Sequence, residues 1–246
     1  MTDKPAESIA AFLHVSALDH RLSPAVLFSA LFTPKHFDKI FFKQAKIHLP
    51  ENIRSASKKR QAEFFAGRYL AALAMQHYNI EHFDILADES RCPIWPQQYI
   101  GSISHSDGFA ACALAPTHKL GAIGIDSQEI LTPARAERLW TKIIDQNELA
   151  ITRGAGFELH EALTLCFSAK ESIYKALYPA IQHFFGFGAA KLCAIDPVKQ
   201  CMEFDFEPAL AQAIGLNNTL RVHYRLDEHR VFSHLSLAPE KFSLAQ

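Results

Sequence analysis

Two long stretches of helical periodicity constrain how this chain of 246 residues can fold. The first covers residues 57–78 and the second covers residues 161–178. Ser57 is suited to cap the first helix, and Pro179 is expected to end the second, because proline lacks a backbone N–H. Strand-like segments follow each helix. The order helix, strands, helices, strands predicts an α+β fold in two halves with a site between them.

Seven segments are strand-like, and the last four of them alternate apolar and polar residues in the manner of antiparallel strands. The seven segments are residues 99–104, 109–115, 120–125, 190–195, 201–206, 220–226 and 230–237. The first two are separated by a turn that contains Asp107-Gly108, a dipeptide favoured in hairpins. A further helical pattern covers residues 133–150, and Gly154 follows it as a break.

Composition sets outer limits on the class of protein. Hydrophobic residues make up 49% of the chain, enough to form a sizeable core, and the net charge of −1 argues against a nucleic-acid partner. The five cysteines include no Cys-x-x-Cys pair, which favours reduced thiols. No secretory signal and no apolar run of about 20 residues is visible. We therefore expect a cytoplasmic protein without a transmembrane segment, and a monomer.

Three short segments carry most of the chemistry: Gly101–His105, Gly124–Asp126 and Phe167–Lys175. Asp126 is the first polar residue after a strand-like run, and Glu171 lies on the second helix one turn before Lys175. Mg²⁺ prefers hard oxygen ligands and is usually bound by one or two carboxylates. Asp126 and Glu171 are suited to supply them.

Phosphate oxygens that a metal does not hold need cationic or imidazolium donors. Arg60 and Arg68 lie eight positions apart on the first predicted helix. That spacing is about 80° around the axis, so both can reach one anion. His105, at a strand end, and Lys175 are further donors of suitable kinds. The combined set favours displacement at phosphorus, where catalysis is largely positioning and charge neutralisation.

Each of these residues also has an ordinary structural interpretation. Glu171 and Lys175 could form a plain ion pair, and His105 could merely cap a strand end. Arg91 could touch a phosphate or be an exposed loop arginine. Ser104 could donate to phosphate or have no role.

Four lysines, Lys35, Lys39, Lys43 and Lys46, recur at helical spacing in the N-terminal part of the chain. They predict a helix with one basic face. The face could be ordinary solvated surface or a docking surface for an acidic partner.

Taken in order, these residues resemble the Sfp-type 4'-phosphopantetheinyl transferases, and more closely the subgroup typified by enterobactin synthase component D. The matching segments are Lys59–Arg68, Pro93–Pro96, Gly101–His105, Gly124–Asp126 and Ala162–Ser172. They span about half of the chain, and the Asp126 and Glu171 segments are specific only as a pair. The Trp-Pro segment sharpens the match to the subgroup, although Trp95 itself is expected to be a packing anchor.

The resemblance implies a particular architecture. It consists of two similar α/β halves related by a pseudo-twofold axis, each a helix packed on a three-stranded antiparallel sheet. We expect the halves at residues 1–125 and 126–246, with the active site in the cleft between them. The first half would bind coenzyme A phosphates, and the second would carry the metal-binding carboxylates and the catalytic helix.

The resemblance also implies transfer of the 4'-phosphopantetheine arm of coenzyme A to a serine of an apo acyl or peptidyl carrier protein. The other product is adenosine 3',5'-bisphosphate. The subgroup favours siderophore-type nonribosomal peptide synthesis, while polyketide and polyunsaturated fatty acid synthesis stay open. Which carrier is served is not readable from the chain.

Residue by residue, Asp126 and Glu171 correspond to Mg²⁺ ligands, and Lys175 to a lysine beside the pyrophosphate. These three are the expected catalytic residues. Glu171 is also the usual candidate for general base, although a metal-bound carboxylate is a poor base and a metal-bound water could share that role. The expected coenzyme A contacts are Arg60, Arg68, Arg91, Ser104, His105 and Lys175.

Gln128 departs from the family pattern, because an acidic residue commonly stands two positions after the aspartate. Glu129 is one residue further, and a shift of one residue in a strand turns the side chain to the other face. The amide of Gln128 could coordinate Mg²⁺ directly, hold a metal-bound water, or do neither. Weaker Mg²⁺ binding is therefore expected. A noncatalytic module that binds coenzyme A or a carrier is the alternative, and hydrolysis of a pyrophosphate is a third possibility.

Overall fold

The computed structural model describes residues 4–17 and 22–241, and the chain divides into two compact units, residues 1–116 and 117–246. The division expected between residues 125 and 126 falls inside strand β5 (Ala122–Glu129), which is paired along its whole length with a neighbouring strand. A boundary there would cut a hydrogen-bonded ladder. The division lies instead just before the turn that precedes β5.

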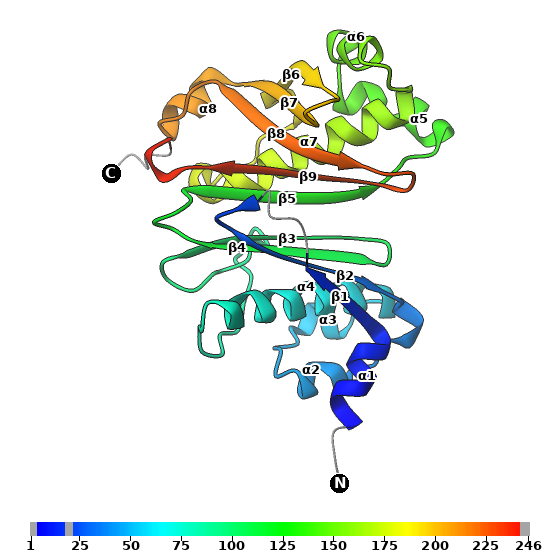
Figure 1. Cartoon of the computed structure of the whole chain (residues 1–246), viewed down its shortest axis with the longest axis vertical. Coiled ribbons are helices and arrows are strands. Elements are labelled where there is room, and N and C mark those ends of the chain that lie inside the picture. Colours follow the sequence, from blue (N-terminus) through cyan, green and yellow to red (C-terminus); the bar gives the residue numbers. More distant parts are fainter. Residues whose placement is uncertain (1–3, 18–21, 242–246) are drawn as a thin grey trace. The chain divides into compact units, whose positions relative to one another are not determined.

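Unit 1 contains a four-stranded antiparallel sheet in the order β1-β2-β4-β3. Its strands are β1 (Leu13–Ala17), β2 (Val26–Phe32), β3 (Tyr99–Ser106) and β4 (Phe109–Pro116). The long helix α4 (Lys58–His77) packs on β4, β2 and β3 and lies along one face of the sheet (Figure 1). Ser57 caps it by accepting a hydrogen bond from the amide of Arg60, as the sequence predicted. Shorter helices are α1 (Lys4–Phe12), η2 (Pro34–His36), α2 (Ile40–Gln44) and α3 (Glu51–Arg54).

The prediction of one basic helix through the four lysines was wrong. Lys35 lies in η2 and Lys43 in α2, and Phe37 between them has an extended backbone that ends the first element. The ring of Phe37 is buried and packs edge-on against Phe41 and Phe42, at centroid distances of 5.9 Å. Burying these rings in the core of unit 1 outweighs a continuous helix. All four lysines are nevertheless exposed.

Unit 2 contains a five-stranded antiparallel sheet in the order β5-β9-β8-β7-β6. Besides β5, its strands are β6 (Ala190–Asp196), β7 (Cys201–Phe206), β8 (Thr219–Leu226) and β9 (Arg230–Leu237). The long helix α7 (Leu159–Ile181) packs chiefly on β5 and β9 (Figure 1). The other helices are α5 (Pro133–Ile143), α6 (Gln146–Gly154), α8 (Pro208–Ala213), η3 (Phe187–Ala189) and η4 (Pro239–Lys241).

The α+β class is confirmed, since each unit places a long helix on an antiparallel sheet. The expected number of three strands per sheet was wrong. In unit 1, β1 pairs with β2 and extends the sheet to four strands. In unit 2, β7 pairs with β8 and β6 pairs with β7, and these two strands bring that sheet to five.

Two helix boundaries also differ from the prediction. Pro179 lies inside α7, which continues to Ile181. A proline so near the end removes few helical hydrogen bonds, and the left-handed Gln182 closes the helix by donating to the Tyr178 carbonyl at 2.8 Å. The pattern over residues 133–150 is two helices rather than one. Asp145 starts the second of them, because its side chain forms a capping box with Glu148.

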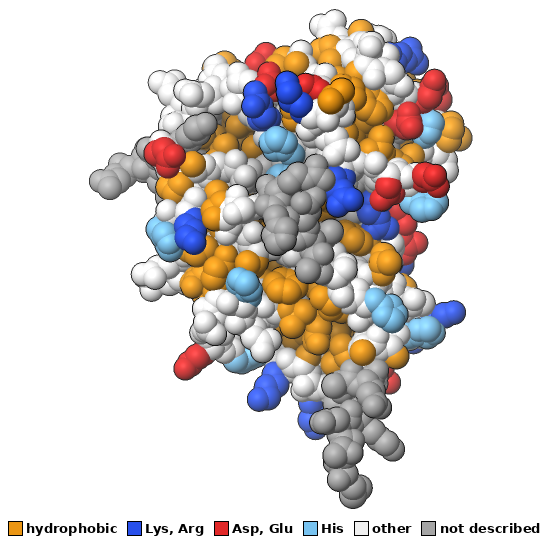
Figure 2. All heavy atoms as spheres, in the orientation of Figure 1, with side chains coloured by type: hydrophobic (Ala, Val, Ile, Leu, Met, Phe, Trp, Pro, Cys, Tyr) orange, Lys and Arg blue, Asp and Glu red, His pale blue; other side chains and the backbone are white. Residues whose placement is uncertain are grey.

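The surface carries charges of both signs. On the face shown in Figure 2, lysine and arginine side chains lie singly or in small groups, and histidines are scattered between them. Among the described residues, no helix is long and apolar enough to cross a membrane.

Candidate active site

Gly124 determines how closely β5 approaches α7. A Cβ atom at this position would overlap the Ser172 carbonyl oxygen and come within 2.6 Å of the Ala176 amide nitrogen. Only a residue without a side chain allows this contact of strand and helix backbone. Because alternate residues of a strand share a face, Asp126 and Gln128 are directed to the same side of β5 as Gly124, toward α7.

The structure brings Asp126 and Lys175 into direct contact. The Lys175 ammonium donates to Asp126 Oδ1 at 2.7 Å, and the Asp126 side chain is only 8% exposed. Glu171 stands one turn earlier on α7. Burial raises the pKa of the Glu171 carboxyl, while Lys175 opposes that rise and Asp126 adds to it. The two carboxylates and the ammonium therefore interact electrostatically in one half-buried place.

These side chains fit a Mg²⁺ ion. Asp126 and Glu171 are hard oxygen donors whose charges interact. Gln128 adds an amide on the same face of β5 as Asp126. Within the described residues, no group of three or more His, Cys, Asp or Glu is placed to hold a metal. Mg²⁺ does not need one, because it usually keeps several waters and takes substrate phosphate as a ligand.

We predict that Gln128→Glu tightens Mg²⁺ binding on the order of tenfold, because a third negative charge would join the pair. Gln128 is half-buried, and its amide nitrogen donates to the Glu129 carbonyl at 3.2 Å. Calorimetric titration of the protein with Mg²⁺ measures the change. Glu129→Gln is the matched control, because Glu129 points to the other face and should leave the affinity unchanged. An unchanged titration for Gln128→Glu would remove Gln128 from the site.

In unit 1, a second group of charged residues joins α4 to the end of β3. Arg60 Nη1 donates to His105 Nε2 at 2.7 Å. Glu63 Oε2 lies 3.7 Å from Arg60 Nη1 and 3.6 Å from His105 Nδ1. Two of the predicted phosphate contacts are thus adjacent. Glu63, which the sequence analysis did not single out, lies between them; its position three residues after Arg60 on a predicted helix was the available signal.

Arg68 lines an open pocket in unit 1, whose empty space of about 340 Å³ includes solvent-filled space at its mouth. Burial lowers the pKa of Arg68 to about 10, so the side chain stays cationic at neutral pH. Its Nε is buried without a hydrogen-bond partner among the described residues, and its guanidinium lies 4.8 Å from the centre of the Phe64 ring. A desolvated cation of this kind is suited to an anion.

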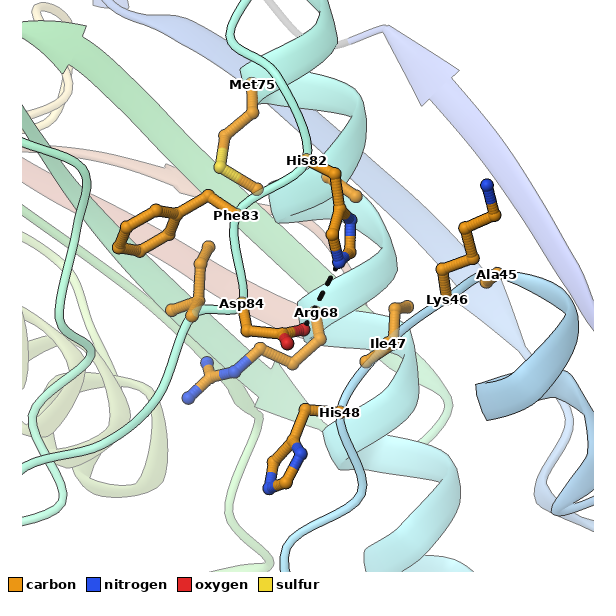
Figure 3. Close-up of a pocket in the computed structure, with 11 residues that line it drawn as sticks. Ala45, Lys46, Ile47, His48, Arg68, Met75, His82, Phe83 and Asp84 are labelled. Atoms are coloured by element: carbon orange, nitrogen blue, oxygen red, sulfur yellow. Dashed lines mark ion pairs between the residues drawn. The ribbon is translucent and has the colours of Figure 1, made fainter.

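The rest of the pocket is mostly polar on one side. Figure 3 shows Arg68 extending from α4 and lying beneath Asp84. Asp84 pairs with His82 at 3.6 Å. His48 lines the same pocket from the segment between α2 and α3. Lys46 also lines the pocket, but in this view its side chain points away from Arg68. Arg60 and Arg68 are close enough for the charge of Arg60 to depress the Arg68 pKa further.

Two other predicted contacts lie apart from the Arg60 and His105 pair. Ser104 is buried, and strand alternation directs it to the face of β3 opposite His105. Arg91 is exposed in a turn, with a left-handed φ of 67°. Trp95 packs where predicted, because a Cβ on Gly101 would lie 2.6 Å from its indole ring.

Comparison with known families accounts for both groups. The 4'-phosphopantetheinyl transferase N-terminal domain matches residues 49–115, and the 4'-phosphopantetheinyl transferase superfamily matches residues 122–231. The chain belongs to the 4'-phosphopantetheinyl transferase superfamily. The first match contains Arg60, Arg68 and His105, and the second contains Asp126, Gln128, Glu171 and Lys175.

Among curated relatives, enterobactin synthase component D of Salmonella typhi is 36% identical over 146 residues, which are 59% of this chain and 60% of that protein. The same protein of Escherichia coli K12 is 37% identical over 138 residues, 55% of this chain and 65% of that protein. 4'-Phosphopantetheinyl transferase Npt of Nocardia iowensis is 30% identical over 140 residues, 57% of this chain and 62% of that protein. The chain thus spans about three fifths of the length of the curated relatives it matches.

Proposed function

We propose that this protein transfers the 4'-phosphopantetheine arm of coenzyme A to a serine of an apo carrier protein. The serine oxygen attacks the phosphorus that bears the pantetheine arm. The bond from that phosphorus to the bridging oxygen breaks, the serine proton passes to a base, and adenosine 3',5'-bisphosphate leaves. The observation that carries the proposal is the contact of Asp126 with Lys175 between β5 and α7, with Glu171 close enough to interact electrostatically with both, in a chain of this superfamily.

In this proposal Asp126 and Glu171 hold Mg²⁺, with Gln128 beside them. The ion, when bound, would neutralise charge on the pyrophosphate. Lys175 donates to a phosphate oxygen from its place beside Asp126, and Glu171 is the candidate general base. We assign coenzyme A contacts in unit 1 to Arg60, Arg68, Arg91, Ser104 and His105. Unit 1 then serves the phosphates of the co-substrate, and unit 2 serves the metal and the reaction.

The test is to incubate the protein with coenzyme A, Mg²⁺ and a panel of purified apo carriers, and to follow each carrier by mass spectrometry. We expect the mass gain of the arm, and none when Mg²⁺ is omitted. Binding of coenzyme A without modification of any carrier would instead support the noncatalytic module. Turnover of coenzyme A without a carrier would support pyrophosphate hydrolysis.

We further propose a cytoplasmic role in siderophore or other nonribosomal peptide synthesis, because relatives are named enterobactin synthase component D. Polyketide and polyunsaturated fatty acid synthases are the alternatives that the carrier panel distinguishes. The protein is proposed to act as a monomer.

The exposed lysines Lys35, Lys39, Lys43 and Lys46 remain our candidate for carrier recognition, since carriers present a mostly acidic helix. We predict that Lys39→Glu with Lys43→Glu slows carrier modification about tenfold, while coenzyme A affinity changes less than twofold. Steady-state rates at varied carrier concentration, with calorimetry for coenzyme A, measure the two effects. Equal losses in both would discard the docking surface.

A further inference from the structure

Glu63 occupies an unexpected place for an acidic residue. Its carboxylate lies within 4 Å of both Arg60 and His105, which we assign to coenzyme A phosphate. The Glu63 side chain is 13% exposed, whereas those of Arg60 and His105 are 43% and 31% exposed. A carboxylate behind two phosphate-binding groups repels the ligand by itself. If Glu63 assists phosphate binding, it must therefore act through its neighbours Arg60 and His105.

The tautomer of His105 indicates that role. Arg60 Nη1 can only donate, so His105 Nε2, at 2.7 Å, must be the acceptor. The single proton of the neutral imidazole then lies on Nδ1, the atom 3.6 Å from Glu63 Oε2. The negative charge of Glu63 favours this tautomer over the one protonated at Nε2.

Backbone packing fixes the three side chains in this arrangement. A Cβ on Gly67 of α4 would lie 2.8 Å from Ile103 of β3, so helix and strand approach closely there. Glu63 is four residues before Gly67, and His105 is two residues after Ile103. Four helical residues rise about 6 Å, close to the 6.7 Å or so of two strand residues. The same contact that brings α4 onto β3 therefore sets Glu63 opposite His105.

We propose that Glu63 is a positioning residue for the phosphate-binding pair, an inference that rests on the proposed function. It neutralises part of the positive charge of Arg60 and holds the His105 ring with Nε2 outward. When a phosphate binds and His105 takes a second proton at Nε2, that N–H can no longer accept from Arg60. Both groups then donate to phosphate oxygens, and Glu63 compensates the charge gained by the ring.

The first test is coenzyme A binding by calorimetry as a function of pH, without carrier. Among the described residues, the charged side chains in contact with His105 include Arg60 and Glu63 from α4. Asp107 of the following turn pairs with Lys59 at 2.8 Å, and β4 contributes Ala110 opposite His105. A carboxylate within 4 Å favours the protonated ring, which in turn favours the phosphate. We expect Glu63→Gln to weaken binding about tenfold near neutral pH. The decline of affinity with rising pH should begin at a lower pH than in the wild type.

The second test needs no ligand. Nitrogen-15 spectra of the histidine rings, with His105 assigned from a His105→Gln variant, report which ring nitrogen carries the proton. We expect Nδ1 in the wild type at high pH and a larger share of Nε2 in Glu63→Gln. A wild-type ring protonated at Nε2 would overturn the proposal.

The control is Glu203→Gln, which removes a carboxylate from a surface pair with Arg221 in unit 2 and should alter neither readout. Thermal unfolding checks that each variant is folded, and Glu63→Asp should restore part of the pH profile because it keeps the charge. If the wild type binds no coenzyme A, the proposed function fails while the ring spectra still decide the role of Glu63. If it binds and Glu63→Gln behaves identically, the positioning role is wrong.

Discussion

Replacing Glu171 with Gln is expected to reduce carrier modification by about a thousandfold, the largest loss of activity that we predict. The change keeps the size of the side chain but removes the carboxylate charge, to which we assign Mg²⁺ binding and general-base catalysis. Asp126→Asn should have a similar effect, because it removes the other carboxylate charge, which pairs with Lys175 at 2.7 Å. The rate of mass gain of an apo carrier, at saturating coenzyme A, measures both.

Glu171→Gln should not destabilise the fold. Burial is the main cause that raises the pKa of Glu171, with Lys175 opposing it and Asp126 adding to it. A carboxyl whose pKa is higher in the folded state costs stability when it ionises, and the cost is present at pH values above that pKa. Glu171→Gln removes this cost, so the unfolding temperature at neutral pH should stay the same or rise.

Activity and stability, measured together for Glu171→Gln, distinguish a carboxylate that takes part in the reaction from one that only supports the fold. Glu137→Gln on the exposed surface of α5 is the control and should change neither activity nor stability. A Glu171→Gln protein that unfolds more easily would indicate that Glu171 mainly supports the helix. One that retains transfer within tenfold of the wild type would exclude it from the reaction.

Local signals in the sequence predicted the elements that carry these residues. Capping by Ser57, the Asp107-Gly108 turn and the strand alternation each depend on neighbours in sequence, and the structure confirms those elements. The sequence analysis assigned Asp126 to the cation and Lys175 to the pyrophosphate, and it did not predict a direct pair between them. The structure shows that the two side chains also pair directly, across 49 residues of sequence.

Other features could not be predicted, because their causes are distant in sequence. Lys170, beside Glu171, is buried and pairs with Glu148 at 2.7 Å. That carboxylate also accepts the amide of Leu192 at 2.9 Å. In the described residues β1 pairs with β2, and β2 pairs with β4, which is distant in sequence; the early prolines and phenylalanines concealed the alternation of β1 and β2. In each case tertiary pairing, rather than local propensity, decides the structure.

Gly124→Ala is expected to give the largest loss of stability for the smallest change, about 3 kcal/mol or more in the free energy of unfolding. Alanine normally stabilises a strand relative to glycine by about 0.5–1 kcal/mol. Here the added methyl would meet the backbone of Ser172 and Ala176, which cannot rotate away as a side chain can. Chemical denaturation followed by circular dichroism measures the difference.

Gly124→Ala should also affect the candidate site, because β5 carries Asp126 on one side of this contact. Helix α7 carries Glu171 and Lys175 on the other side. A shift that separates β5 from α7 to accommodate a methyl at residue 124 is expected to lengthen the 2.7 Å bond between Lys175 and Asp126. Mg²⁺ affinity should therefore fall even in the fraction of Gly124→Ala that remains folded. Gly154→Ala is the matched control, because a Cβ there meets nothing within 4 Å, and it should be neutral or slightly stabilising. If both alanine variants were equally stable and bound Mg²⁺ equally, close packing at Gly124 would not be what positions these charges.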